Sequence, residues 1–193
     1  MPISLSKGQG ISLSKEAPTM KKVLVGLGWD ERVTDGEKFD LDLCAFLLDG
    51  NTVYQQPGIV GYMGGCEKGA NDSVVYSGDN QTGEGEGDDE FITVDLDAVP
   101  TNITKIVFTA TIHDAEKRRQ NFGGIEASYV RFVNQDTGVE EVNVDLREDC
   151  DTETAMIFAE LYRHGDDWKV RNLSQGFASG LAGLCGKFGV EVK

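Results

Sequence analysis

The sequence predicts an all-β protein, a two-sheet β-sandwich with a few short helices. Three observations indicate this fold: many short segments alternate apolar and polar residues, turn residues separate them at close intervals, and helical periodicity is rare. Sheets built from such strands bury one face against another sheet. The chain of 193 residues is long enough for one substantial core, and we expect a single domain over residues 1–193.

The first 112 residues contain a predicted hairpin and five further predicted strands. Residues 3–14 contain a near-repeat of Ile-Ser-Leu-Ser-Lys across a Gly-Gln-Gly break, which predicts a short hairpin. The strands expected next span residues 23–30, 39–48, 73–76, 91–96 and 105–112. Within 39–48 the alternation places Asp40 and Asp42 on one face and Leu41 and Leu43 on the other.

The second half continues the pattern with short helices at two points. Residues 113–122 predict a short polar helix that contains the basic cluster Lys117-Arg118-Arg119. Strands are expected over 128–133 and 139–146, around turn residues 134–138, and over 154–162 and 168–173. Segment 154–162 also fits helical spacing, but the turn and alternating segment after it favour a strand. A glycine-containing helix over 179–188 is expected to cover one end of a sheet.

The acidic, glycine-rich segment 78–90 is the principal candidate site. It contains six carboxylates and four glycines, without lysine or arginine. Carboxylates this close repel one another unless a cation lies among them, and Ca²⁺ prefers oxygen ligands of this kind. A solvated loop has the same composition, so both interpretations stay open. The segment lacks the EF-hand spacing, since Gln81, Gly83 and Glu84 occupy its third, fifth and sixth positions.

The overall charge limits the classes of partner. With 33 acidic and 18 basic residues the formal net charge is −15, which disfavours nucleic acid and anionic lipid as direct partners. Neither a secretory leader nor a segment apolar enough for membrane insertion is evident, so we expect a cytoplasmic protein. Its four scattered cysteines are expected to be reduced.

Catalytic motifs are not evident. His113 and Asp114 are adjacent, but no serine or cysteine in a recognisable nucleophile context accompanies them. We therefore expect a protein that is not an enzyme. Thiol chemistry, with Cys66 as the most exposed cysteine, remains an alternative.

Several motifs follow one another along the chain: Ser4-Leu5-Ser6-Lys7-Gly8, Val23 to Asp30, Phe39-Asp40-Leu41-Asp42, Ser77 to Gly85 with Gly87 to Glu90, Ile112-His113-Asp114-Ala115, Glu153 to Met156, and Glu160 to Arg163. Taken together and in this order, they resemble the TerD family of tellurium-resistance and stress-response proteins. The sequence departs from the family pattern at Leu43-Cys44 and at Tyr76, and these changes remove no acidic residue.

This resemblance implies a calcium-binding β-sandwich that holds one or two Ca²⁺ ions. The implied metal ligands are Asp30, Asp40, Asp42, Asp79, Asn80, Gly83 through its carbonyl, Asp88, Asp89 and Glu90, with Glu84 and Glu86 facing solvent. It also implies a sensor or scaffold for other proteins of a tellurite-resistance and stress operon, and through them an association with membrane complexes. The alternatives are thiol-based binding or reduction of tellurite, and calcium-assisted binding of a small anionic ligand such as a nucleotide.

Overall fold

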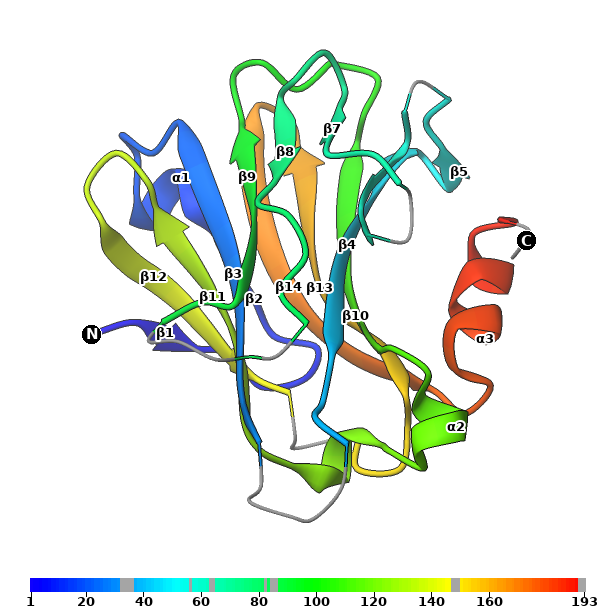
Figure 1. Ribbon diagram of the computed structural model, residues 1–193. Coiled ribbons are helices and arrows are strands. Elements are labelled where there is room, and N and C mark those ends of the chain that lie inside the picture. The colour runs from blue at the N-terminus through cyan, green and yellow to red at the C-terminus, as the bar shows by residue number, and fades with distance from the viewer. Residues whose placement is uncertain are drawn as a thin grey trace.

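Two sheets packed face to face form the molecule, which confirms the predicted β-sandwich (Figure 1). The computed structural model describes residues 1–31, 37–55, 57–62, 65–81, 83, 87–146 and 150–190. The first sheet has the strand order β1-β12-β11-β3-β9-β8-β7, and the second has the order β2-β14-β13-β10-β4-β5 with β6 also paired to β4.

The bounds of the first-sheet strands follow the expected segments, with two short edge strands added. They are β1 (Ile3–Ser4), β3 (Lys22–Glu31), β7 (Lys68–Gly69), β8 (Val74–Tyr76), β9 (Glu90–Asp95), β11 (Ile125–Asn134) and β12 (Val139–Asp145). Pairing is antiparallel throughout except between β1 and β12.

The second sheet contains the strand that carries the aspartate pair. Its strands are β2 (Gly10–Ser12), β4 (Leu41–Asp49), β5 (Thr52–Val53), β6 (Ile59–Gly61), β10 (Lys105–Ile112), β13 (Ala155–His164) and β14 (Asp167–Phe177). The helical elements are α1 (Leu13–Glu16), α2 (Ala115–Arg118), the 3-10 turn η2 (Phe122–Gly124) and α3 (Gly180–Lys187). No helix of the described residues is long and apolar enough to cross a membrane.

The predicted hairpin over residues 3–14 is wrong. β1 pairs with β12 in the first sheet, whereas β2 pairs with β14 in the second. Each copy of the repeat therefore extends a different sheet, and Gly8, at a φ of +81°, lies in the connection between them. Leu5 and Leu13 are both buried in the core between the sheets. Burial of these two leucines stabilises the arrangement in which the two segments pair with different sheets. The local alternation of apolar and polar residues is the same in this arrangement and in a hairpin, so it does not distinguish them.

Aromatic side chains fill the space between the sheets. Phe108 of β10 meets Phe132 of β11 edge to face at 6.0 Å across the sandwich and stacks on Phe158 of β13 at 6.1 Å. All three rings are fully buried. Contacts of this kind contribute about 0.5–1.5 kcal/mol beyond the burial of their area.

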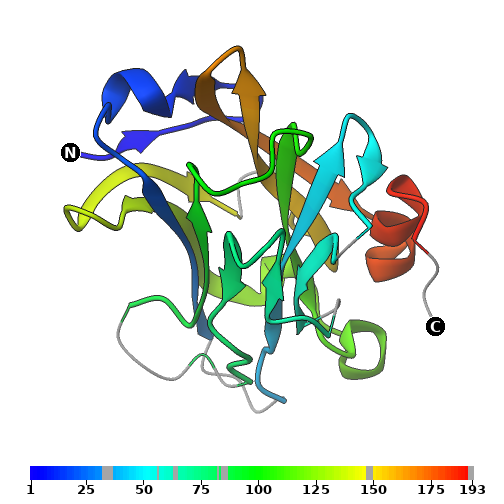
Figure 2. The same ribbon diagram turned by 90° about the horizontal axis from the view of Figure 1, so that it is seen from above.

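The outer face of the second sheet has a smaller core beneath α3. Phe46, Val107, Ile157 and Leu184 are buried there, and the Phe46 ring stacks on Phe188 at 4.4 Å. The helix predicted over 179–188 is thus confirmed, but it covers the sheet's outer face instead of its end (Figure 2). Because both faces of β13 are covered, all residues from Ala155 to Leu161 are buried, which explains its ambiguous sequence pattern.

Helix α2 is shorter than the predicted helix over 113–122. It is a single turn, preceded by Asp114 and followed by Arg119, both in the left-handed conformation with φ of 50° and 55°. A left-handed residue ends helical hydrogen bonding, so Arg119 and not the later glycine pair terminates the helix. The glycine pair belongs to η2.

Candidate metal centre

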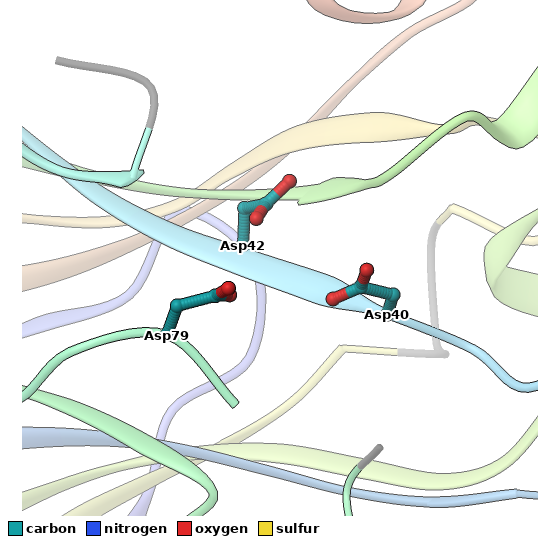
Figure 3. Close-up of side chains that lie close together, drawn as sticks. All are labelled: Asp40, Asp42 and Asp79. Carbon is teal, nitrogen blue, oxygen red and sulfur yellow. The ribbon is translucent and has the colours of Figure 1, made fainter. Parts of the chain in front are cut away.

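Three aspartates from two elements converge at one side of the sandwich. Asp40 immediately precedes β4, Asp42 is the second residue of that strand, and Asp79 lies in the loop after β8. One carboxylate oxygen of each lies within 4.8 Å of the others, and Figure 3 shows the three side chains facing a common space. The two aspartates predicted to share a face thus lie close together, although the strand itself begins only at Leu41.

Hydrogen bonds fix the chain segment that presents Asp40. The Gln120 amide donates to the Glu37 carbonyl at 2.7 Å, and the Trp29 indole donates to the Phe39 carbonyl at 3.3 Å. The His113 backbone N–H donates to the Asp40 carbonyl at 2.8 Å. These contacts come from β3, from the residue after β10 and from the turn after α2. The Asp40 side chain is therefore set by three separate parts of the fold.

Glu90 joins the two elements that carry the other aspartates. Its Oε2 accepts from the Leu43 N–H at 2.8 Å, and its Oε1 accepts from the Asn80 N–H at 3.1 Å. Leu43 follows Asp42 and Asn80 follows Asp79, so one fully buried carboxylate fixes the separation of the two aspartates. The family resemblance implies Glu90 as a metal ligand. In the structure both of its carboxylate oxygens accept backbone hydrogen bonds that position Asp42 and Asp79.

Burial and mutual repulsion make the cluster hard to ionise. Desolvation, followed by the charges of Glu90, Asp40 and Asp79, raises the pKa of Asp42 to about 8. Desolvation also raises the pKa of Asp40 and, to about 7, that of Glu90. A cation among these groups would lower all three pKa values, because an opposite charge favours the ionised form.

One buried carboxylate oxygen of the cluster accepts no hydrogen bond from the described residues. Asp40 is 6% exposed, and its Oδ1 has no hydrogen-bond partner among the described residues. Its Oδ2 lies 3.9 Å from a guanidinium nitrogen of Arg118. A buried carboxylate oxygen without a donor is costly. A bound cation would provide the missing partner.

The spacing of the oxygens allows one divalent cation to contact all three carboxylates. One oxygen of each lies within 4.8 Å of the others, and two ligands on opposite sides of a Ca²⁺ ion lie about 4.8 Å apart, because each bond is about 2.4 Å. This limit includes the separation of about 4.2 Å in Mg²⁺ sites as well. Three carboxylates leave coordination positions for other oxygens, since Ca²⁺ takes six to eight.

Asp88 and Asp30 lie outside this cluster. Both oxygens of Asp88 are engaged by Arg131, at 2.8 Å to Nε and 3.0 Å to Nη2. Gly26 lies directly beneath this carboxylate, since a Cβ there would come 2.2 Å from Oδ2. Asp30 is exposed near the end of β3. The structure therefore gives Asp88 an ion-pair partner of its own.

The remaining implied ligands form a hydrogen-bonded layer beside the cluster. The Trp29 N–H donates to Asp89 at 2.9 Å, and the Asn80 amide reaches the same carboxylate at 3.4 Å. Gly83 donates its N–H to the Asn80 side chain at 3.3 Å and packs against the Trp29 indole. Glu84 and Glu86 lie outside the described residues. This layer connects the acidic loop to β3.

Two arginines at the site were not predicted from the sequence. Arg131 belongs to β11, 43 residues from Asp88, and Arg118 belongs to α2, 78 residues from Asp40. The basic cluster at 117–119 was visible in the sequence, but nothing in its spacing indicated an aspartate as partner. Of the cysteines, Cys44, Cys150 and Cys185 are buried and Cys66 is partly exposed.

Comparison with known proteins agrees with this architecture. The TerD domain model matches residues 1–188. The chain is 51% identical over 191 residues to the tellurium resistance protein TerD of Serratia marcescens, covering 99% of both chains. It is 49% identical over 193 residues to general stress protein 16U of Bacillus subtilis, covering all of both.

A solved structure shows the same fold at greater distance. A crystal structure of a homologue of telluride resistance protein TerD from Streptomyces coelicolor superposes with a TM-score of 0.68 at 23% identity, covering 84% of this chain and 94% of that one. The full-length family match and the two close relatives carry the assignment. This chain belongs to the TerD family of tellurium-resistance and stress-response proteins.

Proposed function

We propose that this chain is a calcium-binding, non-enzymatic stress protein that acts in tellurite resistance as a Ca²⁺-dependent sensor or scaffold. The observation that carries the proposal is the cluster of Asp40, Asp42 and Asp79 with the unpartnered buried Oδ1 of Asp40. The family membership supports the link to tellurite and stress.

Metal binding would order the acidic loop. Without a cation, Asp79 and the β4 aspartates repel one another, and the loop is held mainly through Glu90 and Asp89. A divalent cation replaces this repulsion with bonds to both elements, so the free energy of binding stabilises the loop on the sandwich. An ordered loop of fixed shape is a surface that partner proteins of the same stress response can recognise.

The experiment is calorimetric titration of chelator-stripped protein with Ca²⁺, with Mg²⁺ as the control ion. We expect saturable Ca²⁺ binding with a dissociation constant in the micromolar range or below, and much weaker binding of Mg²⁺. Asp79→Ala should abolish the Ca²⁺ signal, and Asp97→Asn, which changes an exposed aspartate just after the C-terminal end of β9, should preserve it. Equal affinity for the two ions, or Ca²⁺ binding that survives Asp79→Ala, would refute the proposed site.

A further inference from the structure

A cavity of about 1070 Å³ adjoins the aspartate cluster. It lies on the outer face of the second sheet, between α2, the start of α3 and β6, and Figure 1 shows the two helices close together there. Asp42 belongs both to the cluster and to the lining of this cavity. A cation held by Asp42 would therefore stand at the cavity wall. The volume suits a ligand of the size of a nucleotide.

The cavity also has an apolar wall with an available aromatic ring. Among the described residues four large apolar side chains are exposed, and two of them, Tyr62 at 46% and Leu181 at 36%, line this cavity. The Tyr62 ring meets His113 edge to face at 6.0 Å and still keeps nearly half its surface in solvent. Exposed apolar groups gathered in a concave site are typical of ligand pockets.

The charges around the cavity make anion binding conditional on a cation. Among the described residues, its lining contains the acidic residues Asp42, Asp114 and Glu116 and one lysine, Lys117. Lys117 is highly exposed and lies 3.2 Å from the Asp114 carboxylate. Without metal the lining carries more negative than positive charge and repels an anion. A divalent cation at Asp42 reverses the field at that end and has coordination positions open.

We propose that this cavity binds a small organic phosphate with a flat apolar body, in the manner of a nucleoside diphosphate. The flat body packs against Tyr62 and Leu181, while the phosphate oxygens complete the coordination of the cation held by Asp42 and approach Lys117. This inference rests on the proposed calcium site and adds to it the ligand that the site recognises. Binding then requires the cation and the apolar wall together.

The test is equilibrium binding of ADP to the full chain, with calcium in excess over nucleotide and separately with chelator. Adenosine provides the flat body alone and inorganic pyrophosphate provides the phosphates alone. In calcium, we expect ADP to bind at least about tenfold more tightly than either fragment. In chelator, we expect ADP to bind at least about tenfold more weakly than it does in calcium. Equal binding of ADP and pyrophosphate, or ADP binding unaffected by chelator, would overturn the proposal.

A matched pair of variants separates the cavity from other surfaces. Ala182→Trp fills the cavity from an exposed position on α3, and Val139→Trp places the same side chain at an exposed position on the other sheet. Ala182→Trp should weaken ADP at least about tenfold, and Val139→Trp should not. Calcium titration of the unsubstituted chain separates the two proposals. If that chain does not bind calcium, the metal site is refuted; if it binds calcium but not ADP, this inference alone is refuted. Ala182→Trp should still bind calcium, and equal ADP binding by the two tryptophan variants would overturn the placement of the ligand in this cavity.

Discussion

Asp42→Asn tests the electrostatic account of the cluster most directly. In the metal-free protein, burial and neighbouring carboxylates raise the pKa of Asp42 from 3.8 to about 8. Protons therefore bind the folded state more tightly, and the stability contributed by this group is full below pH 4 and falls as the pH rises to about 8. An amide keeps the shape of the side chain and removes the charge.

The magnitude follows from the pKa shift. A pH of 7 lies about three units above the ordinary pKa of an aspartate, and each unit corresponds to about 1.4 kcal/mol. Burial of Asp42 therefore lowers the free energy of unfolding at pH 7 by at most about 4 kcal/mol. Burying an amide in the same place costs about 1–2 kcal/mol. We therefore expect Asp42→Asn to raise the free energy of unfolding in chelator at pH 7 by about 2–3 kcal/mol.

Calcium should remove most of the stability difference between the two proteins. At a concentration one hundred times its dissociation constant, Ca²⁺ stabilises a binding-competent chain by about 2.7 kcal/mol, whereas the variant gains none. Urea unfolding followed by circular dichroism, with chelator and with calcium at pH 5, 7 and 8, measures both effects. The control is Asp97→Asn, whose side chain is 70% exposed and should change little. A variant less stable than the wild type in chelator at pH 7, or one that calcium stabilises equally, would refute the reasoning.

Four further predictions concern the same region. Glu90→Gln cannot accept both backbone N–H groups, and we expect Ca²⁺ affinity to fall about tenfold or more by titration; unchanged affinity would contradict its positioning role. Arg131→Met removes the guanidinium partner of the Asp88 carboxylate, which is 7% exposed, and should lower the free energy of unfolding measured in urea by about 2 kcal/mol. A tenfold loss of Ca²⁺ affinity in this variant would instead identify Asp88 as a ligand. Calcium binding should release protons at pH 7, and calcium affinity should rise from pH 6 to about 8, because the raised pKa values of Asp42 and Glu90 leave protons that the ion must displace. Titration in buffers of different ionisation enthalpy measures this release, and the absence of proton release would contradict the pKa assignments. Cys66→Ser should leave tellurite resistance of cells intact and Asp42→Asn should abolish it, and the reverse result would favour thiol chemistry.

The sequence by itself determined the strands and the location of the acidic chemistry. Side-chain direction alternates along a strand, so the pattern from Phe39 to Leu48 was sufficient to place Asp40 and Asp42 on one face. The same local rule identified β11, β12 and β14, because their inner positions are apolar and their outer positions are mostly polar. β10 was identified by a continuous run of strand-forming residues, and both of its faces are covered. The family resemblance added the calcium ligand set, and the composition of the loop alone made a cation plausible.

The tertiary structure decided which acids meet and which are paired elsewhere. Asp79 and Asp88 belong to one loop, yet Asp79 faces the β4 aspartates while Asp88 faces Arg131 on β11. The two ends of the 3–14 repeat likewise joined different sheets. Such outcomes depend on contacts between residues far apart in the chain, whose energies are fixed only after both sheets have packed. Alternation is a property of a single strand, whereas the partner of a buried charge is a property of the whole fold.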